Sequence, residues 1–110
     1  YHPGFTQKEC VEFCKKNNIL VEAWSSLGRG NVLDNPLLKS IASNHGKSVA
    51  QVVIRWVMQT GVLPLVKSVT PSRIKENFDV FDFELSQQEM FEIASLKADR
   101  IGADPDTCDF

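Results

Sequence analysis

The segment Lys67–Asn77 gathers the polar side chains with the clearest chemical potential in this chain of 110 residues. Thr70 followed by Pro71 has the form of an N-cap with proline at the first helical position, so the sequence predicts a helix that begins at Pro71. The first turn of a helix carries free backbone N–H groups and the positive end of the helix dipole, which both favour anions. The cationic and hydroxyl side chains beside that turn are Lys67, Ser68, Thr70 and Arg73. Together these groups predict a phosphate-binding site.

Two further polar side chains extend this predicted site along the same helix. Arg73, Glu76 and Asn77 stand at positions i, i+3 and i+4, which places them on one helical face. Glu76 and Asn77 could then hydrogen-bond a base, so the segment is a candidate nucleotide-binding site. Two alternatives stay open: Glu76 could pair with Arg73 within the helix, and Lys67 and Arg73 could be a solvated surface pair.

The rest of the chain alternates helix and strand signals at the spacing of βα units, without repeats or linkers. Five helices are predicted. The first begins at a Thr6 cap, with Glu9 as its capping-box partner, and ends near Asn17–Asn18, and the second runs from Pro36 to Asn44. The third runs from a Ser48 cap to about Gln59, the fourth begins at Pro71, and the fifth begins at a Ser86 cap with Glu89 as its partner. The predicted strands are Ile19–Trp24, with Glu22 as an inward polar exception, and Leu63–Val66. Leu27–Asn35 is a predicted loop, Asp79–Glu84 a connector, and a tail begins near Ala98.

Composition excludes several classes of protein. Hydrophobic residues make up 43% and charged residues 24% of the chain, which is average for a soluble globular protein. A net charge of -2 lacks the basic excess of a nucleic-acid binder. There is no apolar run near the ~18 residues of a membrane span and no signal-peptide pattern, so we expect no membrane partner. Three cysteines without framework spacing suit a reducing compartment, and we expect a cytoplasmic protein.

Several residues that could carry chemistry receive structural interpretations instead. Cys10 and Cys14 have the i, i+4 spacing of two metal ligands, but no histidine or third cysteine lies nearby in the sequence, so we predict buried thiols and no metal site. Trp56 is predicted to pack in the core, and Arg55 to form a structural ion pair. His45 suits a helix C-terminus, where an imidazolium interacts well with the dipole.

The segment Lys67–Asn77 also resembles the cofactor-binding segment of the aldo-keto reductases, in which the end of the eighth barrel strand and the next helix hold the adenosine 2'-phosphate and adenine of NADPH. Further motifs of that family occur in the same order, and the match spans essentially all of residues 1–110. These motifs are Tyr1-His2-Pro3, Ala23-Trp24-Ser25-Ser26-Leu27-Gly28, Gly46-Lys47-Ser48 with Ala50-Gln51-Val52, Val80-Phe81-Asp82-Phe83 with Leu85-Ser86, and Asp104-Pro105-Asp106.

The resemblance implies an α/β fold that is part of a (β/α)8 barrel. Such barrels need about 250 residues, so residues 1–110 would be an incomplete, C-terminal portion with two full strands plus helices, starting at the end of the sixth strand. The family's catalytic Asp, Tyr, Lys and His come from the first half of the barrel. We therefore expect no catalytic residue here, and Tyr1 and His2 are not given that role.

The resemblance also implies a role for individual residues in binding NADP(H). Lys67 and Arg73 would hold the 2'-phosphate, Glu76 and Asn77 the adenine, and Ser68, Val69 and Thr70 belong to the same binding segment. Ser25, Leu27 and Gly28 would line the path of the pyrophosphate, and Trp24 would stack on the nicotinamide, where many relatives carry tyrosine and where core packing is the alternative. Ser26 departs from the family pattern, because proline is usual there.

The function implied is the NADPH-dependent reduction of a small aldehyde or ketone, with the missing N-terminal part of the barrel as the partner that supplies the proton donor. Ile101, Pro105 and Phe110 in the tail would help to shape the substrate mouth. Two other classes stay open: a non-catalytic nucleotide-binding or regulatory piece, and an interaction protein that assembles with copies of itself.

Overall fold

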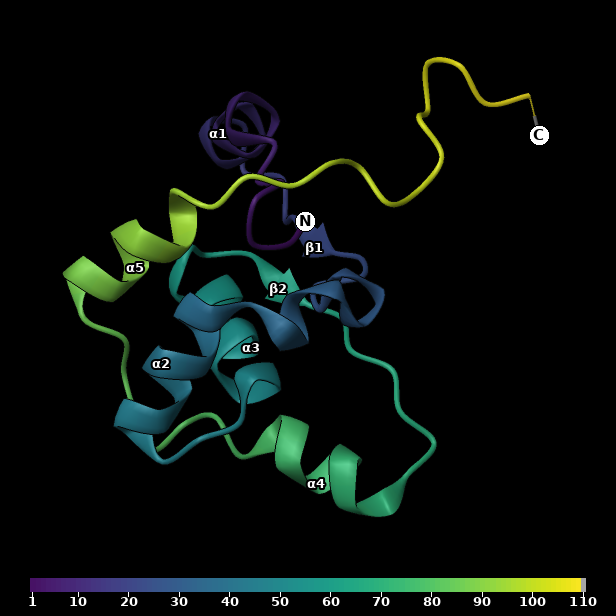
Figure 1. Cartoon of the computed structure of the whole chain (residues 1–110). Coiled ribbons are helices and arrows are strands. Elements are labelled where there is room, and N and C mark those ends of the chain that lie inside the picture. Colours follow the sequence, from purple (N-terminus) through teal and green to yellow (C-terminus); the bar gives the residue numbers. More distant parts are fainter. Residues whose placement is uncertain (110) are drawn as a thin grey trace.

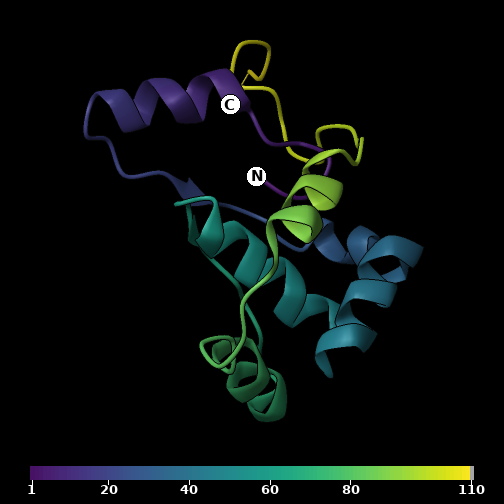
Figure 2. The same cartoon turned by 90° about the vertical axis from the view of Figure 1, so that its left-hand side faces the viewer.

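The computed structural model describes residues 1–109 and contains two short strands with helices packed against them (Figure 1). The elements are α1 (Lys8–Lys16), β1 (Glu22–Ala23), the 3-10 helix η1 (Gly28–Asp34), α2 (Pro36–His45), α3 (Val49–Gln59), β2 (Leu63–Pro64), α4 (Pro71–Phe78) and α5 (Gln87–Ala94). Two views show α1 and the C-terminal tail at one end of the molecule and α4 at the other (Figures 1 and 2).

The two strands pair in parallel, as expected for neighbouring strands of a barrel. Glu22 lies opposite Leu63 and Ala23 opposite Pro64, and α3 lies in the connection between the strands. The N–H of Leu65 extends the pairing by donating to the carbonyl of Ala23 at 3.2 Å. The structure is therefore an incomplete α/β barrel, which confirms the predicted fold class.

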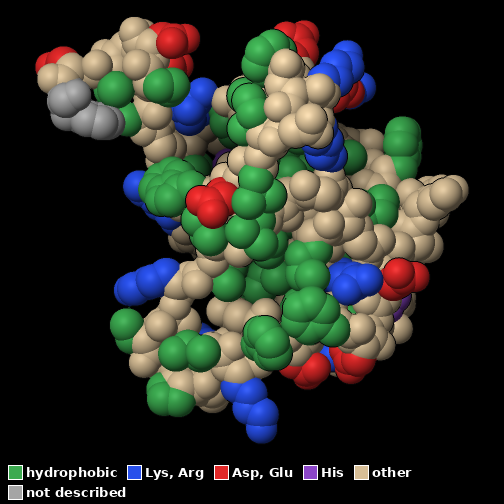
Figure 3. All heavy atoms as spheres, turned by 180° about the vertical axis from the view of Figure 1, so that it is seen from behind, with side chains coloured by type: hydrophobic (Ala, Val, Ile, Leu, Met, Phe, Trp, Pro, Cys, Tyr) green, Lys and Arg blue, Asp and Glu red, His purple; other side chains and the backbone are tan. Residues whose placement is uncertain are grey.

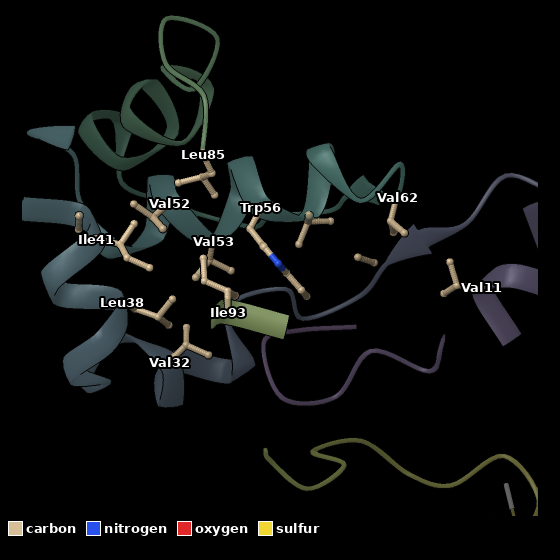
Figure 4. Close-up of a cluster of buried hydrophobic side chains, with 13 residues drawn as sticks. Val11, Val32, Leu38, Ile41, Val52, Val53, Trp56, Val62, Leu85 and Ile93 are labelled. Carbon is tan, nitrogen blue, oxygen red and sulfur yellow. The ribbon is translucent and has the colours of Figure 1, made fainter. Parts of the chain in front are cut away.

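The hydrophobic core is built around one face of α3 (Figure 4). Trp56 is 1% exposed, and its ring stacks on Tyr1 with the ring centroids 5.4 Å apart. Leu38 of α2 and Ile93 of α5 close the cluster from the other side. The predicted core role of Trp56 is confirmed, and burial of these large side chains is the main apolar contribution to stability.

Three of the helices that begin where the sequence predicts carry local side-chain caps. Asn35 caps α2 with its side chain, and Gly46 ends that helix in the left-handed region with φ 62°. The Ser48 and Ser86 capping boxes form with Gln51 and Glu89 as partners. In each box the serine hydroxyl accepts one of the N–H groups that a helix start leaves free.

The predicted start of α1 is wrong. The N-cap position is occupied by Gln7 in the left-handed region with φ 45°, and no side chain caps the helix. His2 and Phe5 form a small antiparallel bridge just before it, so the chain enters the helix from a tight turn rather than through Thr6. The Thr6–Glu9 capping box is therefore absent.

Three other segments differ from the prediction in form. Ile19–Trp24 is strand only at Glu22–Ala23 and Leu63–Val66 only at Leu63–Pro64, because in the described chain each strand has one neighbour and meets it over two residues. Glu22, predicted to point inward, is exposed. The predicted loop Leu27–Asn35 instead forms η1, with a kink at Arg29 and Gly30, which both have positive φ.

Polar side chains link the helices to one another and to the connector. His45 and Glu89 approach to 2.8 Å and join α2 to α5. Burial raises the pKa of Glu89, but hydrogen bonds from Ser86 and His45 outweigh it and hold that pKa below its ordinary value. Arg55 pairs with Glu84 at 3.5 Å, which confirms its predicted structural role.

The cysteines of α1 do not behave as predicted. Cys10 is exposed and Cys14 is half-buried, because this helix contributes only Val11 to the buried core. The prediction of buried thiols is therefore wrong. Among residues 1–109 there is no group of three side chains that could hold a metal ion, and no helix is long and apolar enough to cross a membrane.

Large apolar side chains remain exposed on the described chain, and Figure 3 shows one face on which hydrophobic side chains gather. The exposed residues on and beside the two strands include Ile19, Leu20, Trp24, Leu63, Leu65 and Val66. In a closed barrel, strand residues of this kind are covered by neighbouring strands and helices. Apolar surface and unpaired strand edges favour association.

We therefore expect an isolated polypeptide of residues 1–110 to self-associate, because its two strands have open edges and exposed apolar side chains. Size-exclusion chromatography with light scattering measures its mass directly. The full-length protein, measured under the same conditions, is the control. A monodisperse monomer of 12.3 kDa that unfolds cooperatively would contradict this expectation.

Candidate functional site

The first turn of α4 retains free hydrogen-bond donors. Pro71 is the first helical residue and Thr70 the N-cap, as predicted, but the Thr70 hydroxyl does not cap the helix. Instead, the N–H of Thr70 donates to the Ser68 hydroxyl at 3.1 Å. Within residues 1–109 the N–H groups of Ser72 and Arg73 have no acceptor. These groups are available to an anion, and a free helix start of this kind suits a phosphate.

The two cations predicted to hold a phosphate are exposed. Neither Lys67 nor Arg73 forms an ion pair with any residue of the described part of the chain. The intrahelical pair between Arg73 and Glu76, which the sequence left open, does not form. The backbone carbonyl of Glu76 is instead bound by Gln51 of α3.

A groove of about 620 Å³ separates the segment after β2 from α4. It brings together three of the predicted site residues, Lys67, Ser68 and Asn77. Arg73 and Glu76 do not line it. The remaining walls were missed in the sequence analysis and are Val66, Ile74, Lys75 and Phe78. The i, i+4 spacing of Ile74 and Phe78 could have predicted these wall residues, because it marks an apolar helix face beside Lys75.

A second hollow of about 280 Å³ joins this groove to the loop after β1. Ser25 and Leu27 line it on one side and Leu65 on the other, while Val66 and Lys67 line both hollows. The two hollows therefore adjoin at Val66 and Lys67, and together they form what we call the track, which is lined by residues from Ser25 to Asn77. Gly28 lies outside this track, in a hollow that it shares with His2 and the Leu96–Asp99 segment.

The loop at the start of the track is held by a buried serine. Ser25 has a φ of 54°, and the N–H of Gly28 closes a turn by donating to its carbonyl at 2.8 Å. Ser26 is 1% exposed, and its hydroxyl donates to the carbonyl of Ala23 at 3.0 Å. This bond ties the loop to the end of β1, so it restrains the loop at the position where proline is usual in the resembling family.

Trp24 lies apart from the track, in a hollow of about 390 Å³ beside the tail. Its side chain is 54% exposed, so core packing does not explain it. The guanidinium of Arg29 stands 5.2 Å from the centre of the Trp24 ring, a cation–π contact. A Cβ on Gly102 would approach the ring to 2.8 Å, so the tail passes directly against it.

The predicted tail residues are placed differently. Ile101 is half-buried and lines the Trp24 hollow, while Pro105 is exposed and does not. Phe110 lies outside the described residues. Val69 and Thr70, also predicted to belong to the binding segment, connect Ser68 to α4 without lining the groove.

The comparisons with known proteins cover almost the whole chain. The sequence model that describes the aldo/keto reductase family matches residues 1–98. Glyoxal reductase of Bacillus subtilis (strain 168) is 51% identical over 107 residues, which are 96% of this chain and 39% of that protein. Methylglyoxal reductase DkgA of Escherichia coli (strain K12) is 44% identical over 108 residues, again 96% of this chain and 39% of that protein.

Solved structures agree with these sequence relatives. A crystal structure of a Gox0644 mutant in complex with NADPH superposes on this chain with a TM-score of 0.96 at 44% identity. The match covers 100% of this chain and 41% of the Gox0644 chain. The present chain thus spans about 40% of the length of the proteins that it matches.

Replacement of the buried Ser26 tests how the loop at the head of the track is held. We expect Ser26→Ala to lower the free energy of unfolding of the full-length protein by about 1 kcal/mol, because a buried hydrogen bond to Ala23 is lost. Urea denaturation measures the change. Ser43→Ala is the matched control, because Ser43 is exposed on α2, and we expect it to stay within about 0.5 kcal/mol. Equal effects of the two substitutions would contradict a restraining role for Ser26.

Proposed function

Because the chain belongs to the aldo/keto reductase family, we propose that the whole protein is an NADPH-dependent oxidoreductase that reduces a small aldehyde or ketone to an alcohol. We also propose that residues 1–110 are the C-terminal portion of its barrel domain and carry much of the cofactor site. The relatives are consistent with this substrate class, since two of them are named for the reduction of glyoxal and methylglyoxal.

The observation that carries the proposal is the track of two adjoining hollows, lined by residues from Ser25 to Asn77. Its α4 end combines free backbone donors, the unpaired cation Lys67 and an apolar wall of Ile74 and Phe78. These groups fit a phosphorylated adenosine, because the phosphate needs donors and positive charge while the base needs a flat apolar surface and hydrogen-bonding groups.

Each part of the cofactor has residues here that suit it. Lys67 and Arg73, with the free N–H groups of the first turn, would bind the 2'-phosphate, and Asn77 with Glu76 would contact the adenine. Ser68, Val69 and Thr70 would complete this binding segment, and Trp24 would stack on the nicotinamide. Ser25 and Leu27 would line the pyrophosphate path, and Gly28 would hold that loop by closing its turn on Ser25. The bound cofactor supplies a hydride to the carbonyl carbon of the substrate. The remainder of the barrel would supply the proton donor.

The preference for NADPH over NADH would come from charge. The 2'-phosphate adds negative charge that is stabilised only where cationic groups are unpaired, as Lys67 and Arg73 are in the described chain. Arg73 offers a planar fork of donors on the first turn of α4, and Lys67 a compact charge in the track. NADH lacks this phosphate, so its affinity would not depend on Arg73.

Replacement of Arg73 tests this assignment in the full-length protein. We expect Arg73→Ala to raise the Kd of NADPH about tenfold to a hundredfold, because a charge-assisted hydrogen bond to the phosphate is lost. The Kd of NADH should change less than about twofold. Fluorescence titration with each nucleotide measures both constants.

Lys39→Ala is the control for a general loss of surface charge. Lys39 is exposed on α2, pairs with Asp34 at 3.2 Å and lies outside the track, so its removal should leave both affinities unchanged. An unaltered NADPH affinity in Arg73→Ala would remove that arginine from the 2'-phosphate site. A full-length protein that binds neither nucleotide would overturn the proposed function.

A further inference from the structure

Helix α4 carries the nucleotide end of the proposed site, yet it is weakly packed. None of its eight side chains is fully buried. Within residues 1–109, the side chain of Gln51 is the only one from another element that donates to a carbonyl of this helix. In the described chain, hydrogen bonds therefore hold α4 in place more than apolar contacts do.

Gln51 has its amide fully engaged. It is 6% exposed on α3, and its Nε2 donates to the carbonyls of Glu76 and Asp79, each at 3.1 Å. Its Oε1 accepts from the N–H of Ser48 at 2.9 Å. If the amide were flipped, its NH2 group would face the N–H of Ser48 and its oxygen would face the two carbonyls. Only the observed orientation therefore satisfies all three partners. The capping box of α3 thus aims the Gln51 donors at the C-terminal end of α4.

Gln51 is the first member of a polar stripe on α3 that binds the backbone of the following segment. Arg55 donates to the carbonyl of Val80 at 3.2 Å. Gln59 donates to the carbonyl of Leu85 at 3.0 Å and accepts from the N–H of Leu85 at 2.8 Å. The three residues are four apart and lie on one helical face. Of the three, only Gln51 reaches α4.

We propose that Gln51 is a positioning residue for the nucleotide site, acting through α4. This inference rests on the proposed function. A helix of eight residues is a stiff rod about 12 Å long, so fixing its C-terminal end also fixes its first turn. Asn77 follows directly on the bound carbonyl of Glu76, and Arg73 lies one turn before it. The hydrogen bonds of Gln51 therefore set where the adenine and phosphate groups of the site stand relative to Lys67.

Lys47 helps to hold the connector that follows α4, residues 79–84. Its ammonium lies 2.7 Å from the carboxylate of Asp82 and 3.4 Å from that of Asp79. A hydrogen bond from Lys47 holds the pKa of Asp82 below its ordinary value, although partial burial opposes the shift. These contacts act beyond the end of α4, so they steady the connector and leave the register of the helix to Gln51.

The test compares two identical substitutions on one helix in the full-length protein. Gln51→Met and Gln59→Met each remove one amide of similar shape from the stripe, but only the first releases α4. The probe is adenosine 2',5'-bisphosphate, which carries the phosphate and adenine without the nicotinamide. By calorimetry, we expect Gln51→Met to raise its Kd about tenfold and Gln59→Met less than about twofold.

Kinetics separates positioning from general damage. For Gln51→Met we expect the KM of NADPH to rise about tenfold, while kcat at saturating NADPH stays within about twofold of the unsubstituted protein. A merely structural role would move both variants together. Equal Kd values for the two methionine variants would overturn the inference.

A second variant keeps the test decisive if Gln51→Met does not fold. Gln51→Glu retains an acceptor for the N–H of Ser48, since glutamate is a normal capping-box partner, but it lacks the donors for α4. We expect the same rise of about tenfold in Kd, and an unchanged Kd would overturn the inference. If the unsubstituted protein does not bind adenosine 2',5'-bisphosphate, the proposed function fails first, so the two failures are distinguishable.

Discussion

The two faces of α3 constrain the rest of the described chain. Its apolar face, centred on Trp56, packs against α2 and forms the core, which Ile93 of α5 joins. Its polar stripe of Gln51, Arg55 and Gln59 binds backbone groups between Glu76 and Leu85, most of which lie outside any helix or strand. Buried backbone carbonyls must be paired, so this stripe determines the path of the chain after α4. One helix thus fixes both the core and the support of the candidate site.

The sequence predicted α2, α3 and α5 because their caps depend on residues two or three positions apart. Ser48 with Gln51 is such a case, and no distant contact alters it. Thr6 failed although its pattern was similar, because the bridge between His2 and Phe5 sets how the chain enters α1. The length of β1 failed for a related reason. A strand extends only as far as its ladder partner, and a single sequence does not state which residues of β2 it will meet.

The candidate site divides in the same way. Lys67 and Ser68 were found because they flank a helix start, and Asn77 because it stands four residues after Arg73 on the same helical face. Both are local signals. Lys75 was missed, because its place in the groove depends on how α4 lies against the segment after β2. Gln51 was noticed only as part of a motif. Its partners are backbone carbonyls 25 and 28 residues away, and any sequence supplies carbonyls, so no pattern of side chains could reveal the contact.

In the proposed function the two ends of the cofactor site are held by different forces. Trp24 is restrained by Arg29 and the backbone of the tail, through cation–π and close van der Waals contact. The α4 end is restrained by hydrogen bonds to Gln51 of α3. The phosphate of the cofactor is far from the carbon that would transfer the hydride, so binding energy gained at the phosphate would anchor and orient the cofactor. A displacement of α4 would therefore weaken cofactor binding while leaving the contacts of Trp24 intact.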